Sequence, residues 1–204
     1  MLKSKVQSFL KLLSVKKILK IMVLADVLII SAWGLISPIF AIFVTDKIQG
    51  GSLIVVGIAE AIYLGTKSIL QVPIGILIDK TKGEKIDFWL NVAGSLLMSS
   101  SVLLYLAAFL PWHIYLIGFV YGVGFAISYP AWMGLFTRNI ESGRESFVWS
   151  LHSTPIELAS ALTAAAGGYL AEKLGFSTLF IIVFVIGILG TLLFLAIYPE
   201  IEKE

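Results

Sequence analysis

The stretch that decides the fold is Phe176–Tyr198, FSTLFIIVFVIGILGTLLFLAIY, which contains no Asp, Glu, Lys, Arg or His. A helix of this length at 1.5 Å per residue crosses the roughly 30 Å of hydrocarbon in a bilayer. The whole chain of 204 residues is similar in character: 58% of it is hydrophobic and only 14% is charged. A soluble domain of this size needs more polar surface to cover its core. The sequence therefore predicts an all-α integral membrane protein.

Five further apolar blocks precede this stretch, and charged or turn-forming residues separate each block from the next. We predict one domain of six transmembrane helices over residues 18–198. A basic amphipathic segment at the membrane surface (residues 1–17) precedes it, and a tail (residues 199–204) follows it. The short loops require neighbouring helices to be antiparallel. The predicted spans are Ile18–Val44, Leu53–Ile78, Ile86–Phe109, Ile114–Phe136, Phe147–Leu170 and Phe176–Tyr198.

The distribution of Lys and Arg predicts the orientation of these spans. Twelve of them lie in the N-terminal segment, the second–third loop, the fourth–fifth loop and the tail, which all share one side of the membrane. Two, Lys47 and Lys173, lie on the other side, and Lys67 lies inside a span. Cytoplasmic loops carry the excess of basic residues. Both termini are therefore expected in the cytoplasm, with the chain in the cytoplasmic membrane.

The second predicted span carries a polar face. Glu60, Tyr63, Lys67 and Gln71 occur at i, i+3, i+7 and i+11, which places them on one side of a helix. Ionisable groups inside a membrane are costly and normally face a bundle interior or a water-filled cavity. This face predicts either a cavity wall that contacts a substrate or coupling ion, or hydrogen bonds between helices that fix their packing. The spacing of these residues is consistent with both roles.

Other spans supply further candidate residues for a cavity. The first span contributes Asp26 and Trp33, the fourth contributes Trp132, and the fifth contributes Glu157. Aromatic rings in a cavity bind apolar or cationic ligands, although packing between helices is an equally simple use for them. For His152, near the cytoplasmic end of the fifth span, we expect a packed, hydrogen-bonded role, and Glu157 is the preferred functional residue of that span.

Several functional classes have no support in the sequence. Cysteine is absent, which excludes thiol nucleophiles and Cys-based metal sites. His113 and His152 are expected near opposite faces of the membrane, too far apart to share a metal. No hydrolase or phosphate-binding motif occurs. The net charge of +2 gives no case for nucleic acid. We therefore expect no enzyme, no metal and no cofactor.

The loop after the second predicted span resembles a known signature. Gly75–Lys85 reads GILIDKTKGEK. It is similar to the loop G-x-L-x-D-R-x-G-R-[KR] that follows the second helix of major facilitator superfamily transporters. Gly83 arrives one residue later than the glycine of that pattern. In the fifth span, Gly167-Gly168 resembles the end of the antiporter motif of drug exporters, but Thr163-Ala164 stands where that motif has Gly-Pro.

The resemblance covers the first six helices of a fold that usually has twelve, arranged as two six-helix halves around a central site. It implies a secondary transporter of an unknown small solute that works by alternating access. Gly75, Asp79 and Lys80 would belong to a conformational latch. A homodimer or a second six-helix protein would supply the other half. The alternative is a membrane subunit or scaffold that keeps the fold but does not transport.

Overall fold

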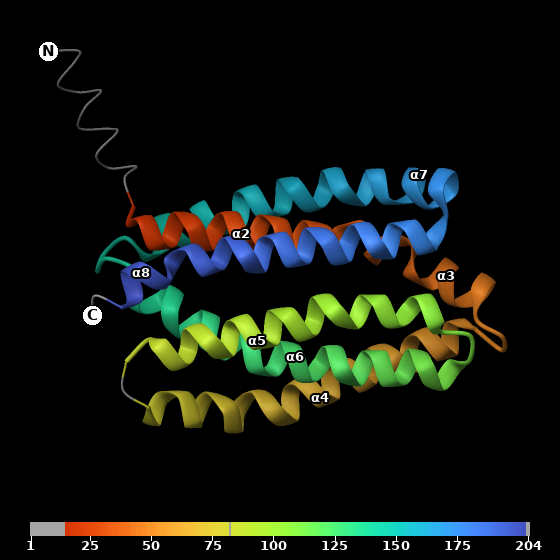
Figure 1. Cartoon of the computed structure of the whole chain (residues 1–204), viewed down its shortest axis with the longest axis horizontal. Coiled ribbons are helices and arrows are strands. Elements are labelled where there is room, and N and C mark those ends of the chain that lie inside the picture. Colours follow the sequence, from red (N-terminus) through yellow and green to blue (C-terminus); the bar gives the residue numbers. More distant parts are fainter. Residues whose placement is uncertain (1–14, 82, 203–204) are drawn as a thin grey trace, which may run out of the picture.

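A computed structural model describes residues 15–81 and 83–202, and all regular elements in these ranges are helices (Figure 1). Most of the predicted surface segment 1–17, the loop residue 82 and the end of the tail therefore lie outside the described residues. The long helices are α2 (Lys17–Gly34), α4 (Leu53–Lys80), α5 (Lys85–Ser101), α6 (Pro111–Arg138) and α7 (Glu145–Phe194). The short ones are η1 (Ser37–Ile39), α3 (Phe40–Lys47), η2 (Val102–Ala107), η3 (Leu195–Ile197) and α8 (Tyr198–Ile201).

Five helical segments in the described ranges are long and apolar enough to cross a membrane, namely Lys17–Lys47, Leu53–Lys80, Lys85–Ala107, Pro111–Arg138 and Glu145–Ile201. The last of these is 57 residues long. It contains Gly175, whose backbone is non-helical with φ 79° and ψ 161°. Glycine adopts a positive φ without the steric cost that a side chain brings. Figure 1 shows α7 folding back on itself at the end of the bundle away from α8 and the start of α2.

Proline and serine set the ends of other helices. Pro111 occupies the first turn of α6, where a missing N–H costs nothing. The Ser52 hydroxyl caps α4 by accepting a hydrogen bond from the Val55 N–H at 3.3 Å. The first predicted span differs from the expectation of one continuous helix, because η1 interrupts it at Pro38. Proline cannot donate to the preceding turn, so α2 ends and α3 begins anew.

The long helices form two packed groups. In the first group, α2 lies along both arms of α7, and in the second, α6 lies between α4 and α5 (Figure 1). The α5–α6 contact is close because two glycines face each other across it. A Cβ on Gly94 would lie 2.5 Å from the Gly124 carbonyl oxygen, and a Cβ on Gly124 would lie 3.0 Å from the Gly94 carbonyl oxygen. Small residues allow helix backbones to approach in this way.

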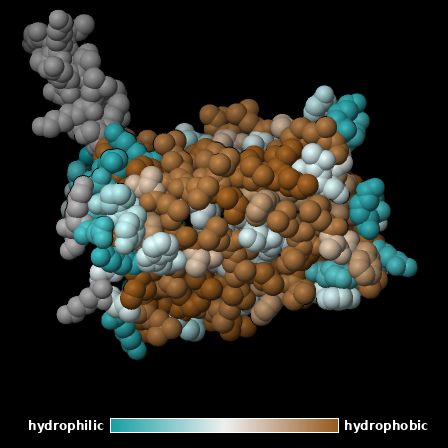
Figure 2. All heavy atoms as spheres, in the orientation of Figure 1, coloured by the Kyte–Doolittle hydropathy of each residue, from teal (hydrophilic) through white to brown (hydrophobic). Residues whose placement is uncertain are grey.

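The surface has an apolar belt between two polar ends. Figure 2 shows hydrophobic residues covering the middle of the molecule and hydrophilic residues at its two ends. Large apolar side chains are strongly exposed in the belt, including Ile54, Ile69 and Leu162. A 3.2 Å ion pair between Lys17 Nζ and Glu200 Oε1 joins the two ends of the described chain. An exposed belt of this kind is stable in contact with lipid and costly in water.

Candidate functional site

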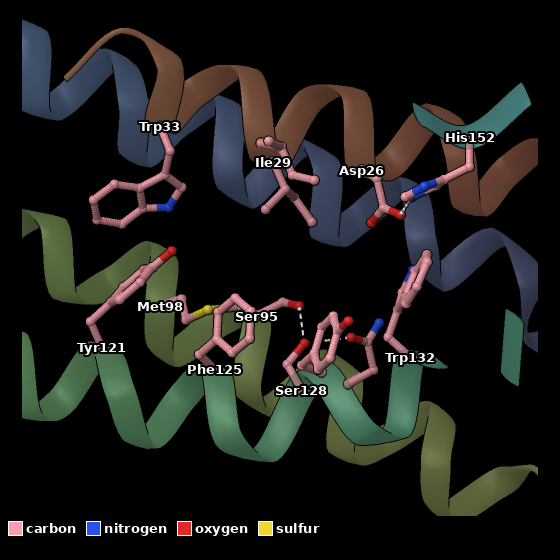
Figure 3. Close-up of a pocket in the computed structure, with 13 residues that line it drawn as sticks. Asp26, Ile29, Trp33, Ser95, Met98, Tyr121, Phe125, Ser128, Trp132 and His152 are labelled. Carbon is pink, nitrogen blue, oxygen red and sulfur yellow. Dashed lines mark hydrogen bonds and ion pairs between the residues drawn. The ribbon is translucent and has the colours of Figure 1, made fainter. Parts of the chain in front are cut away.

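A cavity of about 280 Å³ lies between the two groups of helices (Figure 3). The helices α2 and α7 form one wall, and α5 and α6 form the other. A pocket that is mostly apolar with a few polar groups is the usual form of a small-molecule site. The polar side chains of the lining are Asp26, Asn91, Ser95, Ser128 and His152, and its aromatic side chains are Trp33, Tyr121, Phe125, Tyr129 and Trp132.

The charged end of the cavity holds Asp26 on α2 and His152 on the first arm of α7. The Asp26 Oδ2 and His152 Nε2 atoms lie 2.9 Å apart, and Asp26 is only 9% exposed. A carboxylate and an imidazole at this distance share one proton in a hydrogen bond. Figure 3 shows the second Asp26 oxygen directed toward the space between the helices.

Trp132 lies next to this pair and carries an unused donor. Its ring centroid is 4.9 Å from that of His152. The side chain is buried, and its indole Nε1 has no hydrogen-bond partner among the described residues. An unpaired buried donor costs about 1–3 kcal/mol, so such groups are rare in native proteins. A polar ligand atom or a water molecule in the cavity would satisfy it.

A chain of hydrogen bonds crosses from α5 to α6 beside the cavity. The Ser128 hydroxyl donates to Asn91 Oδ1 at 2.6 Å, and the Ser128 and Ser95 hydroxyls are 3.3 Å apart. All three side chains are buried. This network fixes the polar atoms that α5 and α6 present to the cavity, because each group restrains the rotamer of the next.

The aromatic wall is continuous and supports a lysine on its far side. Trp33 and Tyr121 lie 4.3 Å apart between ring centroids, and Tyr121 lies 5.3 Å from Tyr63. The Lys67 ammonium is 4.1 Å from the centre of the Phe125 ring and 5.9 Å from that of Tyr63. Cation–π attraction therefore holds Lys67 against α6, since ring faces carry negative potential.

Only some of the predicted cavity residues line the cavity in the structure. Asp26, Trp33 and Trp132 come together in the lining of the cavity. Tyr63 and Lys67 contact the aromatic rings of α6 and are not part of the lining. Glu60 on α4 and Glu157 on α7 are exposed, and neither makes a hydrogen bond or an ion pair within residues 15–81 and 83–202.

The predicted latch residues lie at the end of the molecule that holds the Lys17–Glu200 ion pair. Gly75 and Asp79 line a separate groove of about 520 Å³ between α4 and α6, which Arg138 also borders. Lys80 is exposed at the last turn of α4. Arg138 forms ion pairs with Glu84, at 3.3 Å, and with the buried Asp87, so the end of α6 is tied to the start of α5.

Sequence reasoning placed only three of the thirteen lining residues in the predicted site, and the polar side chains that it left out are Asn91, Ser95, Ser128 and His152. The i, i+4 spacing of Asn91 and Ser95 places them on one face of α5, and this is a signal that a sequence carries. His152 is separated from Asp26 by 126 positions, and no local pattern links them. The expectation that His152 is hydrogen-bonded is confirmed.

Comparison with known proteins identifies the family of the chain. A search of curated proteins returns no match to this chain. The family model described as Major Facilitator Superfamily matches residues 22–204, a range that includes every residue lining the cavity. Proteins of this kind are membrane transporters built from six-helix units, and the helical bundle, its apolar belt and its signature loop agree with that description. The chain belongs to the Major Facilitator Superfamily.

Proposed function

We propose that the chain is a secondary active transporter that moves a small solute across the membrane by alternating access. The cavity that holds Asp26 is the observation that carries this proposal. Asp26 lies nine residues into α2, about 14 Å from its start at 1.5 Å per residue, which is close to the middle of a bilayer. Solute sites in such transporters lie near the membrane midplane.

The proposal includes six membrane crossings and cytoplasmic termini. The segment Glu145–Ile201 would extend about 86 Å as one straight helix, far more than the roughly 30 Å of one crossing. The reversal at Gly175 supports two crossings by α7. The end that holds Lys17, Lys80 and Arg138 carries most of the basic residues, which supports its placement in the cytoplasm.

A second six-helix unit completes the proposed transporter. Alternating access in this architecture is the rocking of one unit against another around a shared site. We propose a homodimer, in which a second copy supplies the other wall of the transport path. The exposed charged residues Glu60 and Glu157 support this arrangement, because lipid is a poor environment for them.

Counterflow in proteoliposomes tests the proposal. Purified chain is first screened by thermal stabilisation against a panel of amino acids, sugars and organic amines. Each stabilising compound is then loaded unlabelled into vesicles, and entry of the labelled compound is followed. We expect accumulation of at least one compound, and its loss in Asp26→Asn. If the panel and its close analogues give neither stabilisation nor counterflow in well-folded protein, the transporter proposal is wrong.

The second candidate is a non-transporting membrane subunit that retains the fold. The late Gly83 of the signature loop and the Thr163-Ala164 pair in place of Gly-Pro favour it, since both are departures from transporter patterns. A subunit of this kind would be recovered from membranes in a fixed ratio with another protein. It would show no counterflow even in the intact complex.

A further inference from the structure

Two opposite charges lie near the middle of α4 and of the first arm of α7, and neither has a counter-charge in the described part of the chain. Glu157 is exposed on the first arm of α7, and Lys67 is half-buried on α4 with its ammonium 4.1–5.9 Å from the centres of three aromatic rings. Neither forms an ion pair among the described residues. Ionisable side chains in a membrane-spanning segment normally pair with one another or face water. The described residues therefore leave both charges open to a partner on a second copy.

The two charges lie at similar distances from the same end of the bundle. Lys67 is thirteen residues before Lys80, the end of α4, or about 20 Å along the helix. Glu157 is twelve residues after Glu145, the start of α7, or about 18 Å. Both helix ends lie at the end of the bundle where α2 begins and α8 ends (Figure 1). Glu60 is seven residues further along α4 and thus about 10 Å deeper.

The positions of the helices fit a two-fold axis along the membrane normal. Figure 1 shows α4 at one edge of the bundle and the first arm of α7 at the opposite edge, with their long axes parallel to the expected membrane normal. Rotation by half a turn about an axis in that direction exchanges the two edges and preserves depth. A second copy placed against the face between these two edges would therefore bring the α7 of the second copy next to the α4 of the first. By symmetry, the α4 of the second copy would lie next to the α7 of the first.

We propose that Lys67 of one copy forms an ion pair with Glu157 of the partner subunit, and that the symmetric pair forms at the other end of the same interface. This inference rests on the proposed function, because the interface is the one that closes the transport cavity.

The surface around Glu157 suits close contact with another helix. On its face of α7 stand Ser150, Thr154, Ala161 and Ala165, which are all exposed and small. The large exposed residues Leu151, Leu158 and Leu162 follow a different face. Small residues allow a neighbouring backbone to approach, so the side chain of Glu157 can reach a lysine on that neighbour.

Crosslinking between differently tagged copies tests the contact. The chain has no cysteine of its own, so only the introduced cysteines can react. Lys67→Cys in one copy and Glu157→Cys in the other are co-expressed and treated in membranes with a short bismaleimide. We expect a tagged heterodimer at a yield about tenfold above that of Glu60→Cys with Glu157→Cys. The depth difference of about 10 Å between Lys67 and Glu60 is the reason, since a short linker cannot span it.

Charge reversal supplies an independent measurement by native mass spectrometry in lipid. Lys67→Glu and Glu157→Lys should each lower the dimer fraction about tenfold, and the double variant should restore it, because each single change buries two like charges. Monomers alone in the wild type, a Glu60 crosslink as strong as that of Lys67, or no rescue would each overturn the inference. Counterflow without these crosslinks would leave the transporter proposal standing, and crosslinks without counterflow would refute transport while supporting this contact.

Discussion

Asp26 has the most demanding position of any single residue in the cavity. It is a carboxylate nine residues into α2, and its Oδ2 atom lies 2.9 Å from His152 Nε2. Burial of an ionisable group at this depth costs about 2.5–3.5 kcal/mol on insertion scales. A cost of that size is readily tolerated when the group binds a solute or an ion. The Trp132 indole lies beside this pair, and its buried N–H has no hydrogen-bond partner among the described residues. A donor in this position is consistent with the same use.

Asp26→Asn should therefore lower counterflow by about tenfold or more. The amide keeps the size of the carboxyl but loses the charge, and a hydrogen bond to a charged group contributes about 1.5–3 kcal/mol. Asp46→Asn, an exposed position near the end of α3, is the matched control and should leave counterflow unchanged. Equal activity of the two variants would remove Asp26 from the site.

Ser128 is a residue whose role is structural as well as cavity-lining. Ser128→Ala should lower the free energy of unfolding by about 1 kcal/mol, because Asn91 Oδ1 loses its donor while it stays buried. Ser100→Ala, at an exposed position of α5 with no side-chain hydrogen bond among the described residues, should have little effect. Thermal unfolding in detergent measures both. A loss no larger than in the control would mean that the network adds no stability.

At the scale of elements, glycines decide how closely the helices approach. The α5–α6 crossing depends on Gly94 and Gly124, whereas Gly65 of α4 faces open space, with no atom within 4 Å of a Cβ built there. The open environment of Gly65 is the opposite of the crowded one of Gly94 and Gly124, although all three are glycines in helix interiors. Substitution by alanine therefore separates packing between helices from intrinsic helix propensity.

Gly94→Ala should destabilise the fold by about 1–3 kcal/mol, because the new Cβ would lie 2.5 Å from the Gly124 oxygen and 2.7 Å from the Ser128 nitrogen. Both contacted atoms belong to backbone, which cannot move aside easily. Gly65→Ala should be neutral or stabilising by up to about 1 kcal/mol. Unfolding midpoints of the two variants in the same detergent test the difference. A stable Gly94→Ala protein would show that the crossing is loose.

At the scale of the whole molecule, the long axis of the bundle has two chemically different ends. One end holds the Lys17–Glu200 ion pair, the Arg138 ion pairs and the end of α4. The opposite end holds the α3–α4 connection, the start of α6 and the turn at Gly175. The apolar belt separates them (Figure 2). This asymmetry is the physical basis for a single orientation in the membrane.

Labelling of intact cells with a membrane-impermeant maleimide tests that orientation. Gln49→Cys, exposed between α3 and α4, should be labelled from outside. Ser142→Cys, exposed between α6 and α7, should be labelled only after the membrane is opened. The wild-type chain has no cysteine and serves as the blank. The reverse pattern would place the termini outside the cytoplasm.

Much of the architecture could be predicted from local properties of the chain. Hydropathy and length predict membrane-spanning helices, because each span satisfies its own backbone hydrogen bonds and contacts lipid directly. The loop Gly75–Lys85 pointed to the superfamily, which is confirmed. The predicted break between the blocks Phe147–Leu170 and Phe176–Tyr198 contains Gly175, where the helix reverses. The sequence did not single out this glycine within the break, because the reversal depends on its positive φ.

The site was only partly accessible from the sequence. The cost of an ionisable group in lipid singled out Asp26, Glu60, Lys67 and Glu157, but it could not say which way each side chain points. Tertiary structure alone decided that Asp26 meets His152 across 126 positions while Glu60 and Glu157 stay on the surface. The reason is physical: insertion energy depends on each segment by itself, whereas a cavity exists only where separate helices are rotated and packed against one another.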